Sequence, residues 1–267
     1  MKNTLLLLTI CLVLSGCKND KKTENTESTA TEAEKMAMND EDQNEPDFDV
    51  MPIEHATAVF NIDTTVFYID PVGGAEAFSD QPKPNIILVT DIHGDHLNPE
   101  TIKAIATPET KIIVPQAVAD KLDTGMKKQV TILANGQTTE VYGISIKGIP
   151  MYNLREEAKD FHTKGRGNGY ILEKNGLRVY FSGDTEDIPE MRNLKDIDYA
   201  FVCMNLPYTM TVESAAEGVL AFAPKKVYPY HYRGQDGLSD VKKFKELVEE
   251  GNPDIEVVQL DWYPNKE

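Results

Sequence analysis

Apolar and polar residues alternate in short runs from about residue 57 to the end of the chain, with turn-forming residues between the runs. This pattern is typical of one α/β domain in which strands and hairpins alternate with covering helices. It predicts strands at residues 57–61, 65–70, 86–90, 111–114, 130–133, 138–142, 144–148, 169–173, 178–182, 199–203, 226–230 and 255–259. It predicts helices at residues 99–106, 115–122, 212–222 and 239–249.

The first residues show a different pattern. Lys2 precedes an apolar run from Leu5 to Leu14, and Ser15-Gly16-Cys17 follows. The run has about half the length that a transmembrane helix needs, so residues 1–17 are predicted to be a lipoprotein signal peptide. Cys17 would be the lipidated residue, and the protein is expected to be exported and lipid-anchored to the bacterial cell envelope, in the periplasm or on the outer membrane. Simple secretion is the alternative.

Residues 18–50 contain eleven acidic and four basic residues and almost no large apolar side chains. Such a segment cannot bury enough apolar surface to fold, which predicts a disordered acidic tether. The folded domain is then expected to span residues 51–267. Of the three cysteines, Cys203 alone lies in this domain, within an apolar strand pattern, and a buried, inert thiol is expected there.

The whole chain carries a formal net charge of −17 and has no basic stripe. Nonspecific affinity for nucleic acid depends on Lys and Arg that neutralise phosphates, so the composition argues against a nucleic-acid partner. Lys164 and Arg166 are interpreted as solvated surface charges, with contact to an anionic group of a small substrate as the alternative.

Candidate chemistry is concentrated in the segment from Thr90 to His96, directly after the apolar run at residues 86–89. Two carboxylates and two imidazoles fall within six residues there, in a chain with five histidines in all. Imidazole nitrogen and carboxylate oxygen are ligands that Zn²⁺, Fe and Mn share. His231 and Asp184 also follow strand-like runs, and reactive groups gather beyond the carboxyl ends of strands. These residues are therefore expected to converge with the first cluster, and with His162.

The order of these residues resembles the metallo-β-lactamase-fold hydrolases, whose signature is H-x-H-x-D-H, a lone His, an Asp in G-D-T and a final His. The resemblance covers about residues 52–262. It is closest to the branch with ascorbate-phosphate lactonases and N-acyl-phosphatidylethanolamine phospholipase D, which the runs at residues 54–56, 70–72 and 167–170 also resemble. It implies a four-layer αββα sandwich, which the periodicity alone does not. The first His of the signature is Asp91 here.

By this resemblance, one metal site consists of Asp91, His93 and His162. A second site consists of Asp95, His96 and His231, and Asp184 bridges the two. One or two divalent ions are expected, with Zn favoured and Fe or Mn as alternatives. Because Asp91 supplies a carboxylate where the signature has an imidazole, the first site would favour Fe or Mn, bind its ion more weakly, or bind none and leave a single ion in the second site.

Such a centre implies a metal-dependent hydrolase, because bound divalent ions lower the pKa of water towards roughly 7 and polarise carbonyl or phosphoryl oxygens. The expected substrate is an ester, lactone or phosphodiester of a small or lipid-like molecule. The protein is expected to contact the membrane only through the lipid anchor at Cys17. A protein of the same fold that binds metal or ligand without turnover is the alternative.

Five residues are expected to have roles in the reaction or in positioning, two of them in addition to binding metal. Asp184 would orient the hydroxide and Asp95 would receive a proton. His55 and Tyr208 would contact the developing oxyanion, although a buried imidazole and a helix cap are the structural alternatives. Asp70 is expected to orient a ligand histidine rather than to ligate metal itself.

Overall fold

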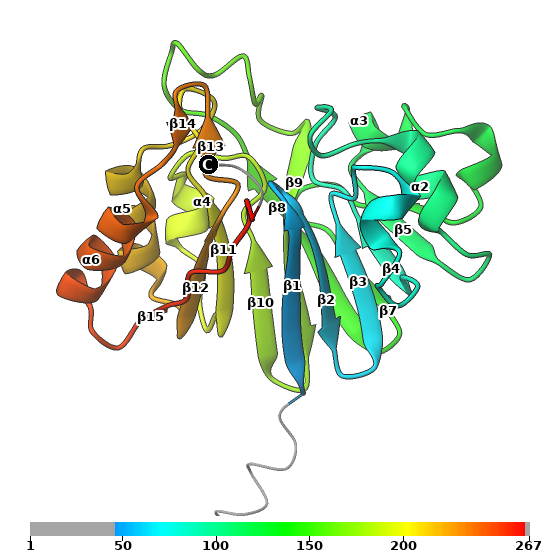
Figure 1. Cartoon of the computed structure of the whole chain (residues 1–267), viewed down its shortest axis with the longest axis horizontal. Helices are drawn as coiled ribbons and strands as arrows, with labels where there is room; N and C mark the ends of the chain where they lie inside the picture. The colour runs from blue at the N-terminus through cyan, green and yellow to red at the C-terminus, as the bar shows by residue number, and fades with distance from the viewer. Residues whose placement is uncertain (1–45, 265–267) are drawn as a thin grey trace, which may run out of the picture. The chain divides into compact units, whose positions relative to one another are not determined.

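In the computed structural model, which describes residues 46–264, two β-sheets pack face to face with helices on their outer sides (Figure 1). The first sheet has the strand order β1 to β6: β1 (Phe48–Glu54), β2 (Thr57–Ile62), β3 (Thr65–Ile69), β4 (Ile86–Leu88), β5 (Lys111–Val114) and β6 (Val130–Ile132). The second has the order β15 (Glu256–Val257), β12 (Lys226–Tyr230), β11 (Tyr199–Cys203), β10 (Leu177–Phe181), β9 (Gly167–Lys174), β8 (Ile144–Met151) and β7 (Thr138–Val141).

Helices cover the outer face of each sheet. The short helices α2 (Pro99–Ile105) and α3 (Gln116–Ala119) lie beside β4 and β5, whereas α4 (Pro189–Arg192), α5 (Val212–Phe222) and α6 (Val241–Gly251) lie beside β11 and β12 (Figure 1). Two 3-10 turns, η1 (Ala75–Phe78) and η2 (Thr124–Met126), and a small hairpin, β13 (Arg233–Gly234) with β14 (Gly237–Leu238), complete the described elements. The predicted four-layer αββα sandwich is confirmed.

Alternating side chains on each strand supply two apolar layers. In β2, Phe60 points into the core between the sheets, where its ring stacks on Phe181 of the other sheet at 4.8 Å. Its neighbour Val59 belongs to the second core, which packs under α2 and α3. Because strand residues point to opposite faces in turn, a central strand with both faces covered is apolar throughout, as Ile86 and Ile87 of β4 are.

Most predicted elements occur within a few residues of their expected bounds, and the differences have physical reasons. Strand β1 begins at Phe48, so the expected tether ends before residue 50 and the folded region begins earlier than expected. This strand lies at the edge of its sheet, contains Pro52 and exposes alternate residues, so its sequence resembles the polar segment before it. The predicted helix at residues 115–122 is shorter, with α3 ending at Ala119.

The described residues 46–264 all belong to one compact unit. The predicted signal peptide, Cys17 and all but the last few residues of the predicted tether lie outside the described residues. Within residues 46–264, no helix is both long enough and apolar enough to cross a bilayer.

Candidate metal centre

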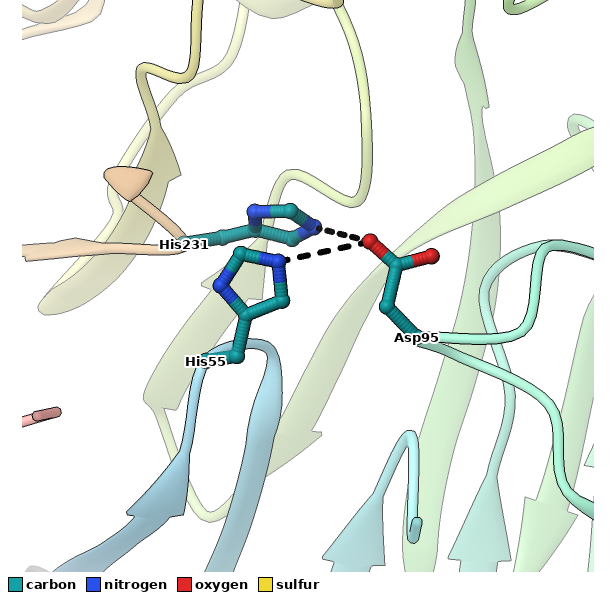
Figure 2. A group of neighbouring side chains, drawn as sticks. All are labelled: His55, Asp95 and His231. Carbon is teal, nitrogen blue, oxygen red and sulfur yellow. Dashed lines mark ion pairs between the residues drawn. The ribbon is translucent and has the colours of Figure 1, made fainter. Parts of the chain in front are cut away.

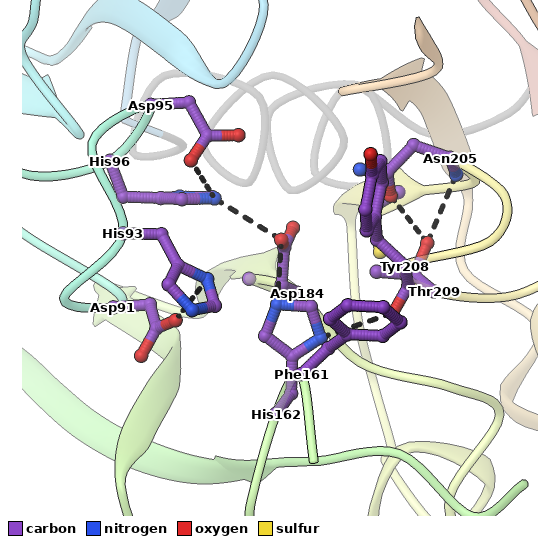
Figure 3. A network of polar contacts seen from close by, with 12 residues as sticks. Asp91, His93, Asp95, His96, Phe161, His162, Asp184, Asn205, Tyr208 and Thr209 are labelled. Carbon is purple, nitrogen blue, oxygen red and sulfur yellow. Dashed lines mark hydrogen bonds and ion pairs between the residues drawn. The ribbon is translucent and has the colours of Figure 1, made fainter. Parts of the chain in front are cut away.

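The candidate ligands meet at one end of the two sheets, on loops that leave strand ends; Figure 2 shows His231 and Figure 3 shows the other six. The loop after β4 carries the segment from Asp91 to His96, Asp184 follows β10, and His231 follows β12. His162 comes from the long segment that joins β8 to β9. The convergence expected from the sequence is therefore observed for all seven candidate ligands, which fall into groups with ligand atoms within 4.8 Å of one another.

The most buried group consists of His96, Asp184 and His231, which are at most 3% exposed. The two imidazole Nε2 atoms lie 3.1 Å apart, and they lie 3.2 and 3.3 Å from the carboxylate oxygens of Asp184. Two ligands at about 2.0–2.1 Å from a tetrahedral ion lie roughly 3.3 Å apart, so these spacings suit ligands of one cation. Among the described residues, Asp184 Oδ1 has no hydrogen-bond partner although it is buried. An oxygen in this state fits a metal ligand.

Asp95 joins this group from the more exposed side. Its Oδ2 lies 3.5 Å from His231 Nε2 and 3.3 Å from His55 Nε2. Figure 2 shows both imidazoles pointing at this carboxylate. The other ring nitrogen of His55 makes a 2.7 Å hydrogen bond with the Tyr263 hydroxyl. Both nitrogens of His55 therefore have polar partners, and His55, Asp95 and His231 form a further group with ligand atoms within 4.8 Å of one another. His55 is not among the residues that line the cavity.

The inner side of His96 is held by Asp70. The Asp70 carboxylate accepts hydrogen bonds from the Thr90 backbone N–H and hydroxyl, both at 2.7 Å, and its Oδ2 lies 2.8 Å from His96 Nδ1. A proton on Nδ1 directed at this carboxylate leaves the Nε2 lone pair free to bind metal. Asp70 thus occupies the place expected for a carboxylate that orients a ligand histidine.

His162 connects the buried group to the rest of the centre. Its Nε2 lies 3.1 Å from Asp184 Oδ2, and its Nδ1 lies 3.2 Å from the Tyr208 carbonyl oxygen. Tyr208 does not cap the next helix, because the Thr211 side chain accepts the hydrogen bond from Ser214 N–H at the start of α5. Tyr208 instead lines the cavity.

The ligand atoms of the second group, Asp91, His93 and His162, also lie within 4.8 Å of one another. Unlike the first group, this one contains a carboxylate that is already paired with a cationic side chain. Arg166 donates from Nε to Asp91 Oδ1 at 2.9 Å and from Nη2 to Asp91 Oδ2 at 2.6 Å. His93 Nδ1 lies 3.0 Å from the same Oδ2. The interpretation of Arg166 as a solvated surface charge is wrong, since its side chain is 18% exposed and forms a two-pronged ion pair with a fully buried carboxylate.

Sequence reasoning missed the role of Arg166, although one signal was available. A carboxylate that replaces a ligand imidazole next to a buried strand needs a cationic partner, because an unpaired buried charge is costly. Arg166 lies four residues after His162, one of the candidate ligands. Lys164, by contrast, is exposed and pairs with Glu190 on the surface.

Electrostatics favour a bound cation at the buried group. Burial alone would raise the pKa of Asp184, but the surrounding imidazoles of His231, His96 and His162 hold the pKa well below its usual value. For Asp95, the contacts with His231 and His55 likewise outweigh burial and lower the pKa. Both carboxylates are anionic at neutral pH. Burial lowers the pKa of His55 to about 4, so this imidazole is neutral.

Three residues of the centre have left-handed backbone conformations: His55 with φ 59°, Asp70 with φ 45° and His231 with φ 47°. Side chains with a Cβ adopt such angles rarely, and the strain persists where surrounding contacts hold the backbone. The backbone here is held by contacts such as the hydrogen bond from His231 N–H to the His55 carbonyl oxygen, at 3.2 Å. These turns aim the three side chains into the centre.

A cavity of about 330 Å³ opens over the ligands. Its lining combines polar groups with two aromatic rings: His93, Asp95, Phe161, His162, Asp184, Asn205 and Tyr208. The rings of Phe161 and Tyr208 meet edge to face at 5.2 Å. The volume lies at the small end of the range for ligand pockets, about 300–1,000 Å³.

Comparison with known proteins places this centre in a family. Residues 50–231 match the beta-lactamase superfamily domain, and this range includes all seven candidate ligands. The chain belongs to the beta-lactamase superfamily. It is similar to a protein from Thermococcus onnurineus named UPF0173 metal-dependent hydrolase, with 30% identity over 65% of this chain and 79% of that relative. The relative from Pyrococcus horikoshii is 31% identical over 61% of this chain and 74% of its own length.

Among solved structures, a protein from Parabacteroides distasonis named as a metal-dependent hydrolase shares 37% identity with this superfamily member. The match covers 82% of this chain and 94% of that one, with a TM-score of 0.73. The metallo hydrolase Igni18 from Ignicoccus hospitalis has a TM-score of 0.66 at 21% identity, over 79% of this chain and 94% of its own, and shares the fold. The protein is thus a metal-dependent hydrolase with His and Asp clusters suited to metal binding.

Proposed function

We propose that this hydrolase cleaves carboxylic esters or lactones that carry an apolar group next to the scissile bond. The observation that carries the proposal is the lining of the 330 Å³ cavity, where Phe161 and Tyr208 face the same space as the candidate metal ligands. Aromatic rings beside polar groups suit a substrate with one reactive and one apolar part. A phosphodiester is disfavoured, because none of the described residues that line this cavity is Lys or Arg.

A bound divalent ion would lower the pKa of water and polarise the carbonyl oxygen of the substrate. His96, Asp184 and His231 are the residues that would hold it, with Asp95 at the cavity side. Asp184 is buried and anionic, so its carboxylate is suited to orient a water molecule towards the substrate.

Asn205 and Tyr208 bound the other side of the cavity and would position the substrate. The Asn205 side-chain oxygen accepts a 2.5 Å hydrogen bond from the Thr209 hydroxyl, which orients the amide. The main chain around Tyr208 is held by Asn153, whose Nδ2 donates to the Tyr208 carbonyl oxygen at 2.6 Å. The substrate would therefore meet a wall whose polar groups are already oriented, which lowers the cost of binding.

The test compares three substrate classes under one set of conditions: p-nitrophenyl esters of increasing acyl length, a simple lactone, and bis(p-nitrophenyl) phosphate. We expect hydrolysis of esters or lactones that a chelator abolishes and that Asp184→Asn removes. Asp254→Asn, an equivalent change at an exposed site, should retain it. Metal-dependent cleavage of the phosphodiester without cleavage of either carbonyl substrate would contradict the proposal.

We also propose that the enzyme is a lipoprotein of the bacterial envelope, attached through Cys17, and that it acts on small or lipid-like molecules there. The apolar run that ends in Leu14-Ser15-Gly16-Cys17 supports this assignment, as does the acidic composition up to the first strand. Cells fed an alkyne fatty acid should label the wild-type chain and not Cys17→Ser, and the variant should leave the membrane fraction. Equal labelling of both chains would exclude lipidation at Cys17.

A further inference from the structure

The Asp91 carboxylate is fully committed to contacts within the protein. Arg166 donates to both of its oxygens, at 2.9 and 2.6 Å, and His93 Nδ1 lies 3.0 Å from one of them. An arginine fork on a buried carboxylate is a strong, directional ion pair, because two parallel hydrogen bonds join two opposite charges.

The backbone fixes Arg166 in this position. The next residue, Gly167, begins β9 so close to the first sheet that a Cβ there would lie 2.7 Å from the Thr90 carbonyl oxygen. That oxygen also accepts a 2.9 Å hydrogen bond from the Asn168 N–H. The start of β9 is thus attached to the residue directly before Asp91. The backbone of Arg166 therefore lies next to Asp91, and its guanidinium is held there by Asp91 and by the Phe161 carbonyl oxygen.

A metal ion in the first site would have to share this space with the guanidinium. An ion bound to an Asp91 oxygen at about 2.0–2.2 Å would come within a few ångströms of the Arg166 charge. Repulsion between a divalent ion and a neighbouring cation at partly buried positions is large. The donor set of Asp91, His93 and His162 therefore does not fit an ion while Arg166 is present.

We propose that Arg166 takes the place of the first metal ion, so that this hydrolase holds a single divalent ion, bound by His96, Asp184, His231 and Asp95. The charges of the carboxylates in the centre also support a count of one ion. Arg166 neutralises Asp91, which leaves Asp95 and Asp184 as the two anionic groups that face His231. One divalent ion balances these two charges, and a second would leave the buried centre with excess positive charge.

Arg166 also acts as a positioning residue for the cavity wall. Its Nη2 donates to the Phe161 carbonyl oxygen at 2.5 Å, and the same atom lies 3.4 Å from His93 Nε2. The guanidinium thereby links the loop after β4 to the segment that carries Phe161 and His162. In an enzyme with two ions, the first ion would make this connection between the loop and His162.

The test is a count of ions bound by the purified full chain after loading with excess Zn²⁺, and separately Mn²⁺, followed by desalting and plasma mass spectrometry. We expect one ion in the wild type and none in His231→Ala. The double variant Asp91→His with Arg166→Ala should hold two, because it restores an imidazole and removes the cation. Lys164→Ala removes a nearby cation that is exposed, and should hold one.

Two ions in the wild type would overturn the proposal, as would one ion that persists in His231→Ala and is lost in His93→Ala. A folded double variant with a single ion would show that Arg166 is not what closes the first site. If the double variant does not fold, crystals of the wild type loaded with Zn²⁺ decide the question by anomalous scattering. One peak between His96 and His231 is expected, and a second peak beside His93 would overturn the proposal.

Discussion

His96 Nδ1 lies 2.8 Å from Asp70 Oδ2, and both side chains are fully buried. The contact holds the imidazole with its Nε2 atom directed at Asp184 and His231. Asp70 also accepts from the Thr90 N–H, so one carboxylate sets both the ring of His96 and the start of the loop that carries the ligands. Such partners of ligand histidines raise the basicity of the ring and fix its tautomer.

Replacement of Asp70 should therefore weaken metal binding without removing a ligand. Asp70→Asn turns one acceptor oxygen into an N–H₂ donor that faces other donors, and we expect about 10–100-fold lower affinity for Zn²⁺. Competition with a chromophoric chelator measures it. Asp63→Asn is the matched control, because Asp63 also has a positive φ, 51°, but pairs with Lys174 away from the centre. Equal affinities in the two variants would contradict the role of Asp70.

Metal removal should destabilise the protein. The buried anion of Asp184 and the more exposed anion of Asp95 lose their cation, and binding to the folded state alone contributes about 2.7 kcal/mol when free ion is 100 times the dissociation constant. For a domain of this size that corresponds to roughly 5–10 °C in melting temperature. Scanning calorimetry with chelator and with Zn²⁺ measures the shift, and Asp184→Asn should show much less of it. The same melting temperature in both conditions would argue against a metal ion at this group.

The hydrogen bond between His55 and Tyr263 predicts a loss of stability in Tyr263→Phe. The change leaves His55 Nδ1 without its 2.7 Å partner at a buried position, which costs about 1–3 kcal/mol of unfolding free energy. Denaturant titration measures this change. Tyr142→Phe is the control, because its hydroxyl contacts the Glu109 carbonyl oxygen at the surface and should cost little. An equal loss of unfolding free energy in both variants would show that the contact with His55 stabilises the protein no more than a hydrogen bond at the surface.

Phe161 should determine the preference for apolar substrates. Its ring is 38% exposed and lines the cavity, so Phe161→Ala is expected to raise KM for long-chain p-nitrophenyl esters roughly 10-fold, about 1.4 kcal/mol, with a smaller effect on the acetate. Met51→Ala removes another exposed apolar side chain, which does not line this cavity, and should change neither KM value. An equal effect of Phe161→Ala on short and long esters would place the apolar part of the substrate away from this ring.

The thiol of Cys203 should be unreactive in the folded protein. The side chain is fully buried, and burial raises the pKa of the thiol to about 12. Because the thiolate is the nucleophile, a chain shortened to residues 44–267 should react with a disulfide reagent at pH 8 only after denaturant is added. Rapid labelling in native buffer would indicate that the strand β11 opens under native conditions.

Much of the fold was determined by local sequence. Strand and helix positions follow from side-chain periodicity, which acts over a few residues, and the helix starts follow from capping residues such as Thr211 and Asp240. The candidate ligands could be named in advance because the chain has only five histidines, and four of them follow, with Asp91, Asp95 and Asp184, the order of a known family signature. Strand β1 was missed because an edge strand has only one partner and half of its residues face water.

Only the tertiary structure decided which charged side chains form pairs. In sequence, Arg166 is 75 residues from Asp91, and no local rule pairs them; the pairing exists because β9 of one sheet meets the end of β4 in the other. The same packing directs Asp70 at His96 and brings His55 into contact with Asp95. Coulombic and hydrogen-bond energies depend on distances of a few ångströms in space, so a pattern along the chain shows which ligands are available, and only the folded arrangement decides which of them are free to bind metal.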